Sequence, residues 1–112
     1  MAINVTSIVT NGIAKITLAG ELDAGAAGDF RNVVEQVSAE KPQRLVLIMD
    51  DLTFMASAGL RVLVFSKQKM GSGVDIYVIG AHDAVLETIE MTGFHHSVIM
   101  LEAYDAAEIE NL

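Results

Sequence analysis

Apolar and polar positions repeat with two different periods along the chain, and the change from one to the other marks the predicted elements. Residues 3–9 and 13–18 alternate apolar with polar side chains, a period typical of half-buried strands. Asn11-Gly12 lies between them and is a strong signal for a tight turn. We therefore predict an antiparallel hairpin at the start of the chain.

The middle of the chain passes from a strand pattern to a helix pattern. Leu45 to Met49 is an unbroken apolar run, which predicts a strand buried on both faces and ended by Asp50 and Asp51. Helical spacing begins at Ser57, so the segment between is expected to be a short loop. The apolar face of this helix is predicted from Leu60, Val62, Leu63, Val64 and Phe65, with residues 66–69 as its solvated end.

The remaining pattern continues the alternation of helices and strands. Asp23 precedes a helical stripe that Pro42 closes, formed by Ala27, Phe30, Val33, Val34 and Val37. Further elements are a strand at 74–80, a helix from about Asp83 that stops at Gly93, a strand at 97–101 and a helix at 103–112 anchored by Tyr104, Ala107 and Ile109.

This order predicts an α/β fold, a single domain over residues 1–112. We expect a mixed, mostly parallel sheet of about five strands, with about four helices joined through right-handed crossovers. In such sheets, binding sites form in the loops beyond the carboxyl ends of the strands. Ser57 is predicted to lie at such a position.

Composition narrows the classes of function. The formal net charge of −8, from 15 acidic and 7 basic residues, disfavours direct contact with nucleic acid or with an anionic membrane. The chain has no cysteine, and the adjacent His95 and His96 would point to opposite faces of a strand, so we expect no metal site. No segment is apolar for long enough to span a membrane, and we expect a soluble cytoplasmic protein.

Ser57 is the candidate functional residue because the first turn of a helix has free backbone N–H groups and accepts a phosphate readily. The alternative is that Ser57 only caps the helix, a common role for serine worth about 1 kcal/mol. Gly59 lies inside the same helix, and we attribute it to the close approach of another backbone. Asp23 can likewise cap the helix that follows it by accepting from free backbone N–H groups.

The run from Asp51 to Leu63, DLTFMASAGLRVL, resembles the signature of the STAS-domain anti-sigma-factor antagonists. Gly20 to Asp23 and Met91 to Phe94 resemble two further landmarks of that family, so the resemblance spans nearly the whole chain. The sequence departs from the family's Asp-Ser-Ser-Gly form, with Ala56 before Ser57 and Ala58 after it. A second phosphoacceptor and a carboxylate beside Ser57 are thereby lost.

The resemblance implies a function for this chain. An anti-sigma factor that is also a serine kinase would phosphorylate Ser57, and a PP2C-type phosphatase would reverse this. The unphosphorylated chain would bind that anti-sigma factor and release the sigma factor, without a cofactor and without catalysis of its own. Asp23, Asp50 and Asp51 would add to the negative charge around a phosphate. The implied partner-binding residues are Asp23, Thr53, Phe54, Met55, Ala56, Ala58, Gly59 and Arg61.

Other functions receive less support from the residues. A phospho-aspartate receiver would suit Asp50 and Asp51, but the first strands end without an acid pair and no lysine follows the last strand. A serine hydrolase would need a G-x-S-x-G elbow, which is absent, and no phosphate-cradling G-x-x-x-x-G-K-[ST] run supports nucleotide binding. A non-switching interaction or scaffold domain of a signalling assembly remains open as the alternative.

Overall fold

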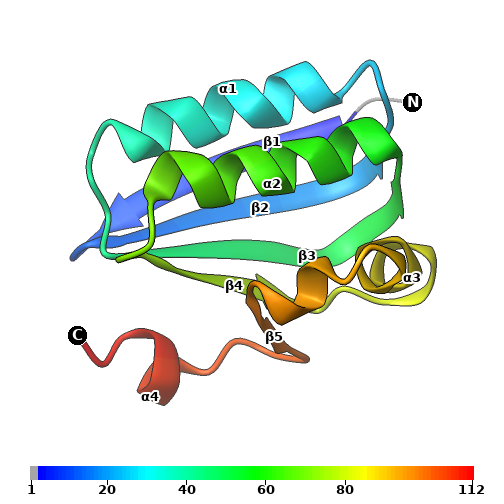
Figure 1. Ribbon diagram of the computed structural model, residues 1–112. Coiled ribbons are helices and arrows are strands. Elements are labelled where there is room, and N and C mark those ends of the chain that lie inside the picture. The colour runs from blue at the N-terminus through cyan, green and yellow to red at the C-terminus, as the bar shows by residue number, and fades with distance from the viewer. Residues whose placement is uncertain (1–2) are drawn as a thin grey trace.

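A five-stranded sheet runs through the computed structural model, which describes residues 3–112, with strands in the spatial order β1-β2-β3-β4-β5 (Figure 1). The strands are β1 (Ile3–Thr10), β2 (Ile13–Leu22), β3 (Arg44–Met55), β4 (Asp75–Ile79) and β5 (Ile99–Leu101). The helices are α1 (Ala27–Ser38), α2 (Ser57–Met70), α3 (Asp83–Met91) and α4 (Ala106–Ile109), with a 3-10 turn η1 (Phe94–His96). The predicted α/β class and element order are confirmed.

The hairpin forms where the sequence predicts it. Strand β1 pairs antiparallel with β2, and Thr10 faces Ile13 across the turn. Asn11 and Gly12 have φ values of 53° and 79°, the left-handed pair that a type I′ turn requires. Every later pairing in the sheet is parallel, so the sheet is mixed and mostly parallel.

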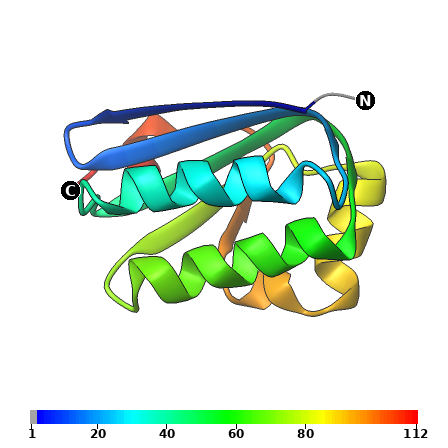
Figure 2. The same cartoon turned by 90° about the horizontal axis from the view of Figure 1, so that it is seen from above.

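Helices α1 and α2 lie side by side on one face of the sheet and run in the same direction (Figure 2). Because both cross over from parallel strands, their amino-terminal ends lie at the same end of the molecule. The stripe predicted for α1 is confirmed: Ala27, Phe30, Val34 and Val37 are buried against the sheet, and Val33 is half-buried.

Helix α2 is rotated from the predicted orientation. Val64 is 41% exposed, whereas Ser66 is fully buried, so the placement of Ser66 in a solvated end is wrong. The buried face is Gly59, Val62, Leu63 and Ser66, which follows helical spacing. The Ser66 hydroxyl donates to the carbonyl oxygen of Leu63 at 2.7 Å, so its burial leaves no unsatisfied group.

Strand β3 is longer than the sequence pattern indicates. We expected Asp50 and Asp51 to end it, but it continues to Met55 and leaves Ala56 alone between strand and helix. Beyond Ile48 the strand pairs only with β2, with an irregularity in the register opposite Asp51. Both carboxylates are exposed there, so they do not oppose strand formation.

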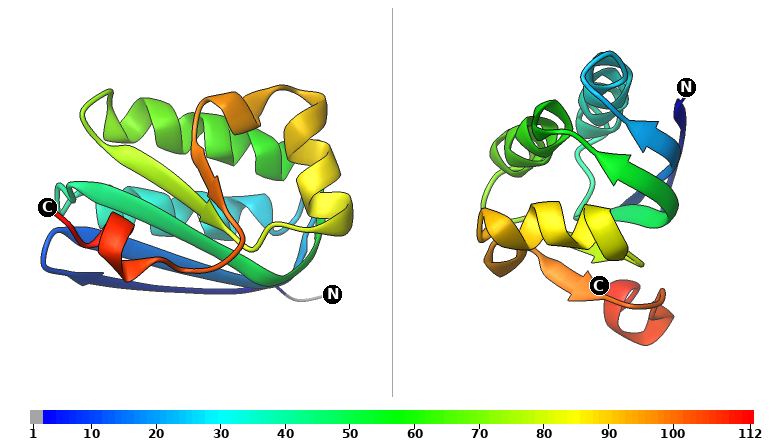
Figure 3. Two further views of the ribbon diagram at one scale, coloured as in Figure 1. Left: turned by 90° about the horizontal axis from the view of Figure 1, so that it is seen from below. Right: turned by 90° about the vertical axis from the view of Figure 1, so that its right-hand side faces the viewer.

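The opposite face of the sheet is covered in part by α4 (Figure 3). Ile109 is buried, and Arg44 holds the helix by donating to the carbonyl oxygens of Glu108 at 2.6 Å and Ile109 at 3.0 Å. The helix is shorter than predicted, and Ala107 is exposed rather than an anchor.

The remaining differences are local. The predicted strand at 97–101 is confined to β5, and His95 and His96 lie in η1 instead of a strand. Their ring centroids are 3.9 Å apart, so the expectation that they point to opposite faces is wrong. Within residues 3–112, no group of three or more histidine, aspartate or glutamate side chains is placed to hold a metal ion.

Candidate functional site

Ser57 is the first residue of α2, as predicted, and its side chain is exposed. Ala56 is the N-cap residue, in an extended conformation, and no side-chain hydrogen bond caps the helix. The Ser57 hydroxyl bonds to no other group between residues 3 and 112. The alternative that Ser57 only caps the helix is therefore wrong, and the hydroxyl is accessible to an enzyme.

Backbone hydrogen bonds on both sides of Ala56 hold the start of α2 in place. The N–H of Ala56 donates to the carbonyl oxygen of Leu22 at 2.8 Å, and the Ala56 carbonyl oxygen accepts from Gly59 at 2.9 Å. The chain thus turns from strand to helix over one residue. The first turn of a helix carries free N–H groups and partial positive charge, which favour an anion at this position.

Gly59 is required by a side chain and not by another backbone. A Cβ atom at this position would lie 2.7 Å from Cγ and Cδ2 of Leu22, closer than such atoms approach in proteins. Leu22 is fully buried at the carboxyl end of β2. The expectation of a close backbone approach is corrected: α2 begins directly on top of Leu22.

Asp23 lies at the same end of the sheet as Ser57. Leu22, directly before Asp23, pairs with Met55, two residues before Ser57, and accepts from the N–H of Ala56. The Asp23 carboxylate accepts from the N–H of Ala26 at 2.9 Å, and Ala26 itself is the N-cap of α1. Asp23 therefore caps the turn before α1, and it is half-buried at this end of the sheet.

The other predicted partner-binding residues divide by exposure. Met55 is 2% exposed and Gly59 is also buried, so the structure assigns both to the core and removes them from a contact surface. Phe54 is 43% exposed, a large apolar side chain open to solvent. The residues left at the surface are Thr53, Phe54 and Arg61, which are exposed, and Ala56 and Ala58, which are half-buried.

Asp50 and Asp51 do not surround Ser57 as predicted. Asp51 precedes Met55 by four residues of extended chain, about 13 Å at the usual rise of a strand. Charges at that separation are largely screened at physiological salt. Of the three predicted acids, Asp23 is therefore the one that follows the strand pair ending next to Ser57.

Two arginines lie near the first turns of α1 and α2, and of these only Arg61 is among the predicted site residues. Arg31 of α1 and Arg61 of α2 line a common hollow between the two helices. Arg31 is also stacked on Phe65, with Cζ 4.0 Å from the ring centroid. No sequence signal reveals this grouping, because it depends on how α1 and α2 rotate against each other.

His82 connects the start of α3 to β3 and was also not predicted. Its Nε2 atom lies 2.9 Å from the carbonyl oxygen of Asp50, and its Nδ1 atom lies 3.1 Å from Oδ2 of Asp83. Both partners can only accept hydrogen bonds, so each ring nitrogen must donate. Both nitrogens carry a proton only when the ring is in the imidazolium form. The Asp83 carboxylate first and the Asp50 carbonyl second raise the pKa of His82.

We expect NMR titration to give His82 a pKa above its ordinary value of 6.5. A raised folded-state pKa means that this group stabilises the fold fully below about pH 6.5 and loses its contribution as pH rises through the folded-state pKa. Asp83→Asn should return the midpoint toward 6.5, whereas a matched change at the exposed Glu90, Glu90→Gln, should not. An unchanged midpoint in Asp83→Asn would contradict the assignment.

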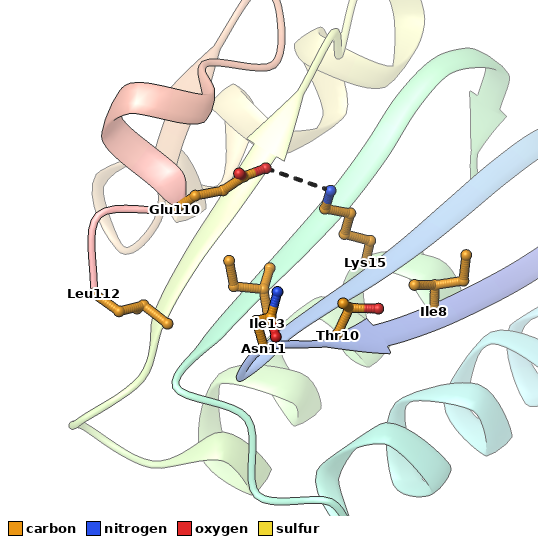
Figure 4. Close-up of a pocket in the computed structure, with 7 residues that line it drawn as sticks. All are labelled: Ile8, Thr10, Asn11, Ile13, Lys15, Glu110 and Leu112. Atoms are coloured by element: carbon orange, nitrogen blue, oxygen red, sulfur yellow. Dashed lines mark ion pairs between the residues drawn. The ribbon is translucent and has the colours of Figure 1, made fainter.

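A larger hollow than the one between α1 and α2 lies at the other end of the sheet from the start of α2. It has a volume of about 530 Å³, and residues of the hairpin and of the last part of the chain line it (Figure 4). An ion pair of 3.7 Å between Lys15 and Glu110 closes one side. This hollow brings together none of the predicted site residues.

No helix within residues 3–112 has the length and apolar character needed to cross a membrane.

The sequence is similar to known proteins over most of its length. The model of the STAS domain family matches residues 4–107. Anti-sigma-F factor antagonist RsfB of Mycobacterium tuberculosis is 28% identical over 92 residues, which cover 82% of this chain and 75% of that protein.

Solved structures show the same fold. An anti-sigma factor antagonist from Mycobacterium paratuberculosis superposes with a TM-score of 0.89 at 21% identity, over 98% of this chain and 96% of that one. SpoIIAA in its unphosphorylated form gives 0.72 at 18% identity, over 97% and 96% of the two chains. The phosphorylated form of SpoIIAA, from Bacillus, gives 0.70 at 18% identity, over 97% of each chain.

Proposed function

Because the chain belongs to the STAS domain family, we propose that it is an anti-sigma factor antagonist controlled by phosphorylation of Ser57. The unphosphorylated chain binds an anti-sigma factor that is also a serine kinase, and this binding releases a sigma factor. Phosphorylation of Ser57 ends the binding, and a PP2C-type phosphatase restores it. The cycle takes place in the cytoplasm and requires no catalysis by this chain.

One observation carries this proposal. Ser57 presents an exposed hydroxyl that caps nothing, at a helix start where the backbone favours an anion. Adding a phosphate there brings about −1.5 to −2 charges and strong acceptors without disturbing a structural hydrogen bond. The fold can therefore hold either form of Ser57 with little change of shape.

The comparisons support the class of partner. RsfB is named as an antagonist of an anti-sigma factor, and SpoIIAA is named in an unphosphorylated and a phosphorylated form. Exposed Phe54 offers the apolar area that a protein interface requires. Asp23 follows β2 at the same end of the sheet, and we propose that it orients the serine or the kinase's magnesium-bound nucleotide.

Intact mass spectrometry tests the proposal. After incubation with the cognate anti-sigma factor and Mg-ATP, the chain should gain the mass of one phosphate, and fragmentation should place it on Ser57. Ser57→Ala should gain none, while Ser72→Ala, at an exposed serine in the turn after α2, should be modified like the wild type. No modification of a chain that binds the anti-sigma factor would support the non-switching scaffold alternative.

A further inference from the structure

A positively charged groove lies between α1 and α2 at their amino-terminal ends. Its volume is about 270 Å³. Figure 2 shows the two helices side by side, with both starts at one end of the molecule. The small residues of the first helical turns leave room between the helices, and each helix contributes one arginine to the lining. The lining residues are Ala27, Gly28, Arg31, Ala58, Arg61 and Val62.

Neither arginine is neutralised by the protein itself. Within residues 3–112, no carboxylate forms an ion pair with Arg31 or Arg61, although the chain as a whole carries a charge of −8. Arg31 lies over the ring of Phe65, which fixes its guanidinium and leaves the in-plane N–H donors free. The two arginines of the groove can therefore bind an anionic group of another molecule.

Arg61 is also the cation nearest in sequence to Ser57 on α2. Residues four apart lie on the same face of a helix, one turn from each other, and helical side chains lean toward the amino terminus. A phosphate on Ser57 would therefore lie one helical turn from Arg61, on the same face of α2. An anion placed four residues before a cation has the favourable order for a helix pair.

We propose that Arg31 and Arg61 bind an acidic segment of the anti-sigma factor, and that a phosphate on Ser57 withdraws Arg61 from this contact. A phosphoserine oxygen pair matches the fork of the arginine side chain, so the intramolecular pair competes with the partner's carboxylate. Phosphorylation then weakens docking by removing a cation as well as by adding negative charge. This inference rests on the proposed role of Ser57.

The intramolecular pair can be measured without any partner or kinase. Phosphoserine is incorporated at position 57 during synthesis, and the second ionisation of the phosphate is followed by phosphorus NMR. The dianion should be favoured by Arg61, so we expect its midpoint in the otherwise wild-type chain to lie roughly 0.2 to 0.5 pH units below that in Arg61→Gln. Arg61→Lys should be intermediate, because lysine keeps the charge but lacks the fork.

The docking contact is measured on unphosphorylated chains by calorimetric titration with the cognate anti-sigma factor. Arg31→Gln and Arg61→Gln should each weaken binding by roughly tenfold or more, as for lost charged hydrogen bonds. Lys69→Gln, which removes one positive charge at the far end of α2, is the matched control and should bind like the wild type. All variants are first compared by circular dichroism and thermal unfolding.

The outcomes separate this inference from the proposed function. Equal phosphate midpoints in wild type and Arg61→Gln, or wild-type affinity in both arginine variants, would overturn the inference while the switch at Ser57 stands. A wild-type chain that binds no anti-sigma factor would overturn both. Weakened docking together with a raised midpoint in Arg61→Gln would establish the inference.

Discussion

Ser57→Asp is expected to lower the affinity for the anti-sigma factor by a factor on the order of 100, whereas Ser57→Ala should bind as tightly as the unphosphorylated wild type. Burying an added carboxylate that the partner does not pair costs a few kcal/mol, and each 1.4 kcal/mol is about tenfold in affinity. The folded state should tolerate the change, because an acid in the first turn of a helix stabilises it by about 0.3 to 1 kcal/mol.

Titration calorimetry at fixed salt measures this difference. Ser72→Asp adds the same charge at an exposed turn at the other end of α2 and serves as the matched control. It should change the affinity by much less than Ser57→Asp. Equal affinities for Ser57→Asp and Ser57→Ala would contradict the claim that negative charge at position 57 weakens binding.

The contact beneath the start of α2 should produce the largest effects on stability. Leu22→Ala is expected to lower the free energy of unfolding by about 2 to 5 kcal/mol, because Leu22 is fully buried. Gly59→Ala should lower it by roughly 1 to 2 kcal/mol: overpacking costs about 1 to 3 kcal/mol, and the better helix propensity of alanine returns part of this. The double variant is the informative one.

Removing the Leu22 side chain also removes the two nearest atoms that a Cβ at position 59 would meet, and leaves Cγ of Met55 at 3.2 Å. In the Leu22→Ala background, Gly59→Ala should therefore be neutral or stabilising, a coupling of about 1 to 3 kcal/mol. Gly28→Ala on α1 is the control, since a Cβ there meets no atom within 4 Å and should stabilise by up to about 1 kcal/mol. If urea unfolding shows that Leu22→Ala and Gly59→Ala change the free energy of unfolding additively, the contact with Leu22 is not the reason for glycine at position 59.

Much of the fold could be predicted because each element carries its own period. Asn11-Gly12 determined the hairpin, and the start of α2 at Ser57 followed from the change of period. Pairing of strands and rotation of helices are not local properties, and there the predictions failed. The exposed Asp50 and Asp51 appeared to end a strand that β2 continues to pair, and Ser66 appeared solvated although its own helix satisfies its hydroxyl.

The sequence predicts the central residues of the candidate site but not which of the surrounding residues are exposed. Ser57 and Asp23 were identified from capping patterns and family resemblance, and the strand ends do bring them to one end of the sheet. Met55 lies in the part of β3 that the sequence pattern predicts to be a loop, so the pattern does not reveal that Met55 is buried. Arg31 joins Arg61 only through the packing of α1 on α2, which periodicity within one helix does not reveal.

Displacement of the sigma factor tests the central claim most directly. A preformed complex of the sigma factor with its anti-sigma factor is titrated with this chain, once with serine and once with phosphoserine at position 57, and free sigma factor is quantified. The unmodified chain should release the sigma factor stoichiometrically, and the phosphorylated chain should release little at the same concentration. Equal release by both forms would show that the hydroxyl of Ser57 does not control the function of this protein.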